Sequence, residues 1–203
     1  MSTRSDVDAA PPRAICVYCA SSRQCDAEYH EAARRLGATL ADSGYGIVYG
    51  GGGGGSMGAL ADGALARGGR VVGVLPRFMV ELEWGHKRLS ELHLVDDMRQ
   101  RKHLMLEHSQ GVVALPGGCG TLDELFDTMT LKRLGLYVHP IVIVNTRGFF
   151  DPLVELLSKA VSERFMAERH HDMWQVVSEP EEVPAAIRAA PAWTSEAQRF
   201  AVP

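Results

Sequence analysis

Residues Gly111–Glu124 read Gly-Val-Val-Ala-Leu-Pro-Gly-Gly-Cys-Gly-Thr-Leu-Asp-Glu. The apolar run stops at Pro116, and an amphipathic segment opens at Thr121. Three glycines lie between them, Gly117, Gly118 and Gly120. This order predicts a strand, a loop and the start of a helix. Because loop N–H groups and the positive end of the helix dipole then converge, the stretch predicts an anion site.

Thr121 and Glu124 have two interpretations. They stand three apart, which is the spacing of a capping box, so both side chains could simply cap the helix. Alternatively, a carboxylate in the first turn beside a phosphate cradle is placed to act on whatever the phosphate is attached to. The glycine loop favours the second interpretation.

Outward from this stretch, apolar runs and helical spacings alternate along the chain. Strands are expected at 15–19, 46–49, 70–75, 92–95, 111–115, 140–145 and 174–177, and helices at 26–43, after the glycines to 67, 98–109, 121–136, 150–165 and 179–189. Such alternation predicts an α/β fold, a doubly wound, Rossmann-like parallel sheet of about seven strands with helices on both faces. One domain is expected over 13–189, with a disordered tail at 1–12 and a loose tail at 190–203.

The composition points to a protein that acts on small molecules. A net charge of -4 over 203 residues gives no support to a nucleic-acid partner. No apolar run reaches membrane-spanning length, and 1–12 lacks the apolar core of a signal peptide, so no membrane partner and a cytoplasmic location are expected. The spacings of Cys and His predict no metal site, and Cys16 and Cys19, three apart on a strand, should face opposite sides.

A second glycine-rich loop runs from Gly50 to Gly58 after a strand, and Ser22 follows the first strand. The loop matches G-x-G-x-x-G, yet the next strand ends in Pro76-Arg77 where a dinucleotide fold expects an acidic residue. We therefore interpret it as a second wall of one nucleotide-sized pocket. Since ligands bind at the carboxyl ends of parallel strands, Ser22, Gly52 and Gly53 are candidate substrate contacts.

Arg101 shares a helical face with Met98 and Met105, which predicts either an inward guanidinium paired with an anion or a stem that snorkels outward. His86, in the irregular stretch 76–90, is expected to be exposed to solvent.

Two stretches of the sequence resemble the signatures of a known family. Pro116–Glu124 resembles the P-G-G-x-G-T-x-x-E signature of the Lonely Guy family of cytokinin-activating phosphoribohydrolases, long labelled lysine decarboxylases, and 98–102 resembles its M-x-x-R-K. Cys19–Ser22 and Gly50–Gly58 agree in order and spacing, so the resemblance covers 15–177.

The resemblance implies hydrolysis of cytokinin riboside 5′-monophosphates at the bond between base and ribose, with no cofactor, and AMP as a further substrate. It implies that Arg101 and Glu124 are catalytic and that the protein is a homodimer. The residues it implies at the substrate or its phosphate are Met98, Lys102, Pro116, Gly117, Gly118, Gly120 and Thr121.

Three other functions remain open. The first is a non-catalytic nucleotide-binding or cofactor-carrier module on the same fold. The second is a dinucleotide-dependent reductase, which the missing acidic residue disfavours. The third is a decarboxylase, which needs a Schiff-base lysine, and Lys102 is the only lysine that we expect near the loops.

Overall fold

The computed structural model describes residues 13–81 and 85–200. The expected disordered tail at 1–12 lies outside the described residues. The seven strands are β1 Ala14–Tyr18, β2 Gly46–Tyr49, β3 Val71–Pro76, β4 Glu91–Val95, β5 Val112–Ala114, β6 Ile141–Val144 and β7 Gln175–Val177. They form one sheet in the order β4-β3-β2-β1-β5-β6-β7, and every neighbouring pair is parallel. The predicted doubly wound sheet is confirmed.

Seven α-helices and four short 3-10 helices occupy the described connections. The α-helices are α1 Ala27–Asp42, α2 Gly55–Leu65, α3 Arg77–Glu81, α4 Met98–Glu107, α5 Cys119–Arg133, α6 Asp151–Ser162 and α7 Val183–Ala189. The 3-10 helices are η1 Thr146–Gly148, η2 Glu168–Met173, η3 Pro180–Glu182 and η4 Ser195–Phe200.

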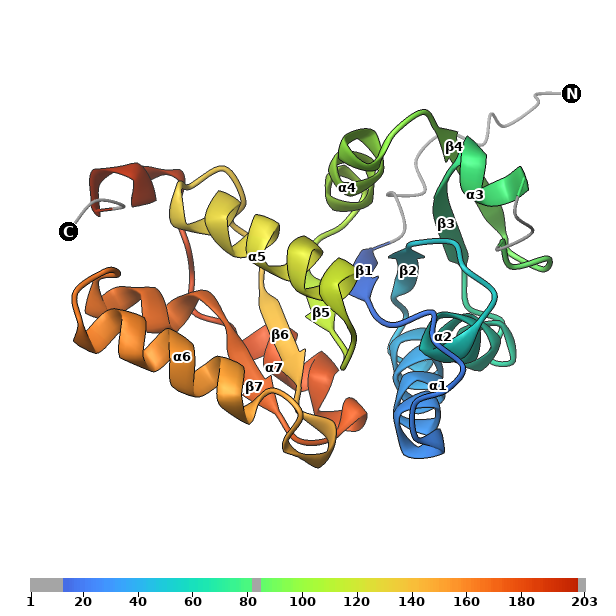
Figure 1. Ribbon diagram of the computed structural model, residues 1–203, viewed down its shortest axis with the longest axis horizontal. Coiled ribbons are helices and arrows are strands. Elements are labelled where there is room, and N and C mark those ends of the chain that lie inside the picture. Colours follow the sequence, from blue (N-terminus) through green and yellow to red (C-terminus); the bar gives the residue numbers. More distant parts are fainter. Residues whose placement is uncertain (1–12, 82–84, 201–203) are drawn as a thin grey trace, which may run out of the picture.

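Each face of the sheet buries its own apolar cluster. Cys16 and Tyr18 of β1 pack with residues of α4, α5 and α6, whereas Ile15 and Val17 pack with residues of α1, α2 and α7. Figure 1 shows the same division, with α4, α5 and α6 away from α1 and α2. Cys16 and Cys19 belong to different clusters, which confirms that they face opposite sides. Near-continuous apolar strands are the pattern that a sheet covered on both faces requires.

Local polar groups begin two helices close to where the sequence places them. The Asp26 carboxylate accepts a hydrogen bond from the Glu28 amide at α1, and that of Asp97 accepts one from the Gln100 amide at α4. By contrast, α5 begins at Cys119, two residues before Thr121, and its N-cap is Gly118, which has no side chain to cap with. The first amides of α5 are therefore left for another partner.

The C-terminal segment differs from the expectation of a loose tail. The Trp193 indole Nε1 donates to the Lys132 carbonyl at 2.6 Å, its ring lies 5.8 Å from Lys132 Nζ, and Ala197 is fully buried. The expectation is wrong for this part because an aromatic ring and small side chains cover the end of α5. Within the described residues, no helix combines the length and the apolarity needed to cross a membrane.

Candidate active site

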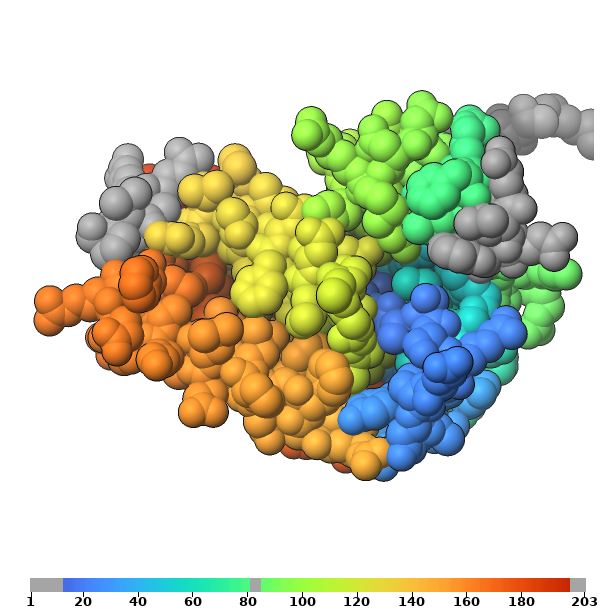
Figure 2. Space-filling model, in the orientation of Figure 1, coloured from blue at the N-terminus to red at the C-terminus, as the bar shows by residue number. Residues whose placement is uncertain are grey.

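A cavity of about 1010 Å³ opens at the carboxyl ends of the central strands. Its walls come from the segments after β1, β2, β3, β4 and β5, on both sides of the β1–β5 boundary where the strand order reverses. Figure 2 shows the surface hollowed between green α4, the yellow-green start of α5 and the blue segment after β1. The pocket predicted from the two glycine loops is therefore formed.

Arg101 lies at the inner end of this cavity, and only 5% of it is exposed. Its Nε donates to the Val74 carbonyl and its Nη2 to the Gly50 carbonyl, each at 3.1 Å. Nη1 lies 3.2 Å from Glu124 Oε1. Since three bonds fix the guanidinium inside the protein, the outward, snorkelling interpretation is wrong.

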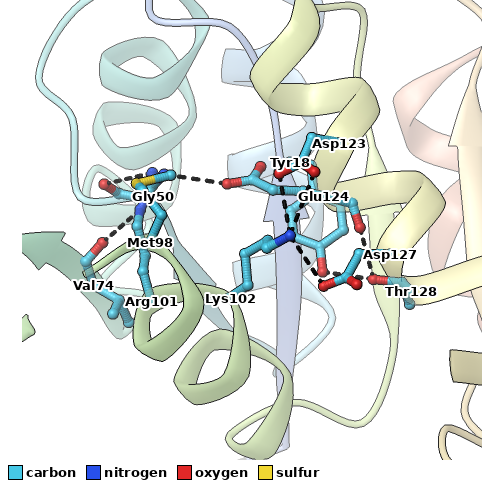
Figure 3. A network of polar contacts seen from close by, with 10 residues as sticks. All are labelled: Tyr18, Gly50, Val74, Met98, Arg101, Lys102, Asp123, Glu124, Asp127 and Thr128. Atoms are coloured by element: carbon cyan, nitrogen blue, oxygen red, sulfur yellow. Dashed lines mark hydrogen bonds and ion pairs between the residues drawn. The ribbon is translucent and has the colours of Figure 1, made fainter.

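Glu124 is 3% exposed and turns toward Arg101 rather than back to its own helix (Figure 3). Because α5 has no side-chain cap, the capping-box interpretation of Thr121 and Glu124 is wrong. Burial raises the pKa of Glu124 to about 7, against the opposing effect of the Arg101 charge, while Asp123 adds to the rise. The carboxyl group therefore exchanges its proton near neutral pH, which suits an acid–base role.

The turn of α5 that carries Glu124 is bound to the central strand. The Thr128 hydroxyl donates to the Glu124 carbonyl at 2.9 Å, and its oxygen lies 2.8 Å from the Tyr18 hydroxyl on β1. Since the single Thr128 proton is already donated, the Tyr18 hydroxyl is the donor in the second bond. This buried chain fixes the height of Glu124 above the sheet.

The predicted phosphate loop divides into an inner and an outer part. Gly118, Gly120 and Thr121 line the cavity, and a Cβ on either glycine would meet only open space. Pro116 and Gly117 do not line it, since Gly117 packs against Thr121, whose Oγ1 would be 2.2 Å from a Cβ there. An anion at this loop therefore meets the free amides of α5.

The opposite wall contains the other residues that the sequence points to. Ser22, Gly52, Gly53 and Met98 all line the cavity. The Gly52 carbonyl accepts from the Tyr49 hydroxyl at 3.0 Å, and Gly52 forms a bridge with Gly85. The glycine run is thus held as a wall by bonds from both sides.

The expectation that His86 is exposed to solvent is wrong. Its side chain is 8% exposed, and Nε2 donates to Asp62 at 3.2 Å, because the Arg88 amide already donates to Nδ1. Both side chains line the cavity, and so do Arg23, Lys87 and Arg88, which the sequence did not single out. The pairing depends on the bridge between Gly52 and Gly85, for which the sequence carries no local signal.

Lys102 does not line the cavity, although the resemblance implied a substrate contact. Its Nζ lies 3.2 Å from Asp123 and 3.3 Å from Asp127, both on α5. Lys87 does line the cavity, so the expectation that Lys102 is the only lysine near the loops is wrong. Over the residues that the structure describes, no cluster of three or more His, Cys, Asp or Glu side chains could hold a metal ion.

Known proteins match this chain in sequence over most of its length. A family profile described as "Possible lysine decarboxylase" matches residues 57–187. The cytokinin riboside 5′-monophosphate phosphoribohydrolase of Rhodococcoides fascians is 38% identical over 88% of this chain and 90% of its own. The phosphoribohydrolase LOG of Oryza sativa subsp. japonica is 39% identical over 77% of this chain, which spans 64% of that relative's length.

Solved structures extend the comparison to the fold. A molybdenum cofactor binding protein from Rippkaea orientalis superposes with a TM-score of 0.66 at 21% identity, covering 93% of this chain and 98% of that one. At that identity the likeness concerns the fold alone. The profile match and the identity to full-length relatives, together with the buried Arg101–Glu124 pair at the glycine loop, place this chain in the Lonely Guy family of phosphoribohydrolases.

Proposed function

We propose that this chain hydrolyses the N-glycosidic bond of cytokinin riboside 5′-monophosphates, releasing the free cytokinin base and ribose 5-phosphate. The proposal is supported by the similar proteins from Oryza, Rhodococcoides and Arabidopsis, whose names give this activity. The observation that carries the proposal is the buried ion pair of Arg101 and Glu124, 3.2 Å apart, beside the open amides of α5.

The chemistry of the bond explains why this pair is useful. Breaking an N-ribosidic bond builds positive charge on the sugar, which an ionised carboxylate stabilises. Glu124 can also take a proton from the attacking water, since its pKa of about 7 is close to neutral pH. Arg101 is fixed by the Val74 and Gly50 carbonyls, so it holds Glu124 in place and offers positive charge to the bound nucleotide.

The cavity favours an anionic ligand. Arg23, Lys87, Arg88 and Arg101 line it together with the two carboxylates of Asp62 and Glu124. We propose that the phosphate binds at Gly118, Gly120 and Thr121, and that Ser22, Gly52, Gly53 and Met98 border the remainder of the nucleotide. Plain AMP, which differs only in lacking the prenyl group, is a further proposed substrate. The homodimer and the cytoplasmic location are proposed as well, the latter supported by four free cysteines.

The test is chromatography of the products formed from isopentenyladenosine monophosphate and from AMP, side by side. The wild-type protein is expected to release base and ribose 5-phosphate, and Glu124→Gln to lower the rate by ~10³-fold or more because the charge that stabilises the transition state is lost. Glu155→Gln, an exposed position on α6, is the matched control and should leave the rate unchanged.

Two results would count against the proposal. Nucleotide that binds but is recovered intact after long incubation with the wild-type protein would favour the non-catalytic carrier. Full activity of Glu124→Gln would remove Glu124 from the mechanism. The reductase has no support from β3, which ends at Pro76 and is followed by Arg77 at the start of α3.

A further inference from the structure

Lys102 connects the two helices that carry the catalytic pair. It follows Arg101 on α4, and its ammonium group reaches Asp123 and Asp127, which lie on either side of Glu124 on α5. Figure 3 shows the ammonium between these carboxylates, with the Arg101–Glu124 pair beside them. Two consecutive residues of α4 thus bind Asp123, Glu124 and Asp127 of α5.

Lys102 is more firmly held than an ordinary surface lysine. Its side chain is 21% exposed, and its Nζ lies within 3.4 Å of both carboxylates. Partial burial alone would lower the pKa of Lys102, but hydrogen bonds to Asp123 and Asp127 outweigh it and raise the pKa. The ammonium therefore stays charged over the pH range in which an enzyme of this class works.

The two catalytic groups are held by different parts of the sheet. Arg101 is bonded to β2 and β3 through the Gly50 and Val74 carbonyls, whereas Glu124 is tied to β1 through Thr128 and Tyr18. The two catalytic groups thus belong to different supports, and the Lys102 bridge spans them. A pair separated by 3.2 Å is sensitive to small shifts of one helix against the other.

We propose that Lys102 is a positioning residue for the reaction, which sets α4 against α5 and neutralises Asp123 and Asp127 so that Glu124 can ionise, and that it is not a substrate ligand. The inference rests on the proposed function. It departs from the substrate contact that the resemblance implied, because Lys102 does not line the cavity.

The charges around Glu124 determine the sign of the effect. Arg101 and Lys102 on α4 lower its pKa, and Asp123 on α5 raises it. Cys16, Tyr18 and Cys19, on or next to β1, are close enough to Glu124 to feel its charge, and burial raises the pKa of each so that they stay neutral. Removing the Lys102 charge removes one lowering influence and leaves the raising influence of Asp123 uncompensated, so the pKa of Glu124 should rise.

The experiment compares Lys102→Met, Lys102→Arg and Asp123→Asn by the pH dependence of kcat and KM. In Lys102→Met the acidic limb of the kcat profile should move upward by ~0.5 pH unit or more, and kcat at pH 6.5 should fall by at least ~3-fold with KM nearly unchanged. Lys102→Arg keeps the charge and should restore most of kcat. Asp123→Asn should move the limb downward, since it removes a raising influence. Lys159→Met, exposed on α6, is the matched control.

If Lys102 were a substrate ligand, Lys102→Met would raise KM and leave the acidic limb of the kcat profile unshifted. That result would overturn the proposal. A readout independent of catalysis separates this failure from failure of the proposed function. The pKa of Glu124 is measured by carbon NMR of glutamate-labelled protein, with Glu124→Gln identifying the signal. An upward shift of that pKa in Lys102→Met supports the charge effect even without hydrolysis, and an unchanged pKa refutes it.

Discussion

At the scale of single residues, the site depends on burying two opposite charges that need each other. Arg101 and Glu124 are 5% and 3% exposed, and an isolated charge at that depth would be costly. Their mutual contact offsets part of the cost, but the pKa of about 7 for Glu124 shows that burial still dominates. The ionised carboxylate thus lowers the stability of the folded protein, a cost that accompanies its role in the reaction.

The raised pKa of Glu124 predicts that the stability of the fold depends on pH. The pKa of Glu124 is about 7 in the folded protein against an ordinary 4.5, so the folded state binds the proton more tightly and stability falls as pH rises from 4.5 to 7. Glu124→Gln mimics the neutral form. At pH 8 its free energy of unfolding should therefore exceed that of wild type by up to ~2–3 kcal/mol, and it should unfold at a higher temperature. The gain should shrink toward pH 4.5. Thermal scans from pH 4.5 to 8 measure it, and a gain independent of pH would contradict the assignment.

Gly50 is the residue whose missing side chain makes room for Arg101. A Cβ at this position would lie 1.8 Å from Arg101 Nη2. Gly50→Ala should displace the guanidinium from the Val74 carbonyl and Glu124, and lower kcat/KM by ~100-fold with the fold retained. Gly46→Ala, whose Cβ would meet its nearest atom at 3.5 Å, is the matched control. Equal activity of the two variants would show that Arg101 does not need its observed position.

At the scale of elements, the position of the glycine wall, the run Gly50–Gly54 that lines the cavity before α2, depends on how closely α1 and α2 approach. A Cβ at Gly37 of α1 would lie 2.1 Å from the Leu60 carbonyl oxygen, and one at Gly63 of α2 would lie 2.1 Å from the Arg34 carbonyl oxygen. The backbones of the two helices therefore touch. Since α2 begins at Gly55, directly after the wall, this contact also fixes the wall of the cavity.

Widening this contact should cost stability. Gly63→Ala forces the helices apart, and we expect a loss of ~1–3 kcal/mol in the free energy of unfolding. Gly120→Ala, on α5 with open space around its Cβ, should not lose stability, because alanine is the better helix former. Urea unfolding of both variants is the measurement. Equal stability of Gly63→Ala and wild type would mean that the helices do not touch in solution.

At the scale of the whole molecule, the cavity lies where two halves of the sheet meet. The half made of β1 to β4 supplies the glycine run Gly50–Gly54 and Arg101, and the segment after β5 supplies the phosphate loop and Glu124. Beyond the cavity, Phe126 on α5 and Leu134 directly after the helix are 39% and 40% exposed. A second copy of this chain would cover them in the proposed homodimer.

The homodimer has a direct test. Sedimentation velocity should give twice the 22.1 kDa of the single chain. Phe126→Asp should weaken the association at least ~10-fold, since a charge would be buried at the interface. Leu156→Asp, on α6 with Leu156 59% exposed, should leave the association unchanged. A wild-type monomer at all concentrations would refute the proposal.

Periodicity and glycine placement in the sequence determined the seven-strand parallel fold and the position of the two glycine loops at the strand ends. Those signals are local, and parallel strands bring their carboxyl ends to one edge by necessity. The family resemblance implied Arg101 and Glu124 as a pair, although the residues themselves left the direction of each side chain open. Only the tertiary structure decided that both turn inward and meet.

Contacts between distant segments were decided by the tertiary structure as well. Gly50 gives Arg101 its space, His86 pairs with Asp62, Lys102 bridges to α5 and Trp193 covers the end of α5. Each of these joins residues more than 20 positions apart, with no repeat or spacing to mark the partner. Side-chain direction and burial depend on packing between elements, and a single sequence does not record that packing residue by residue.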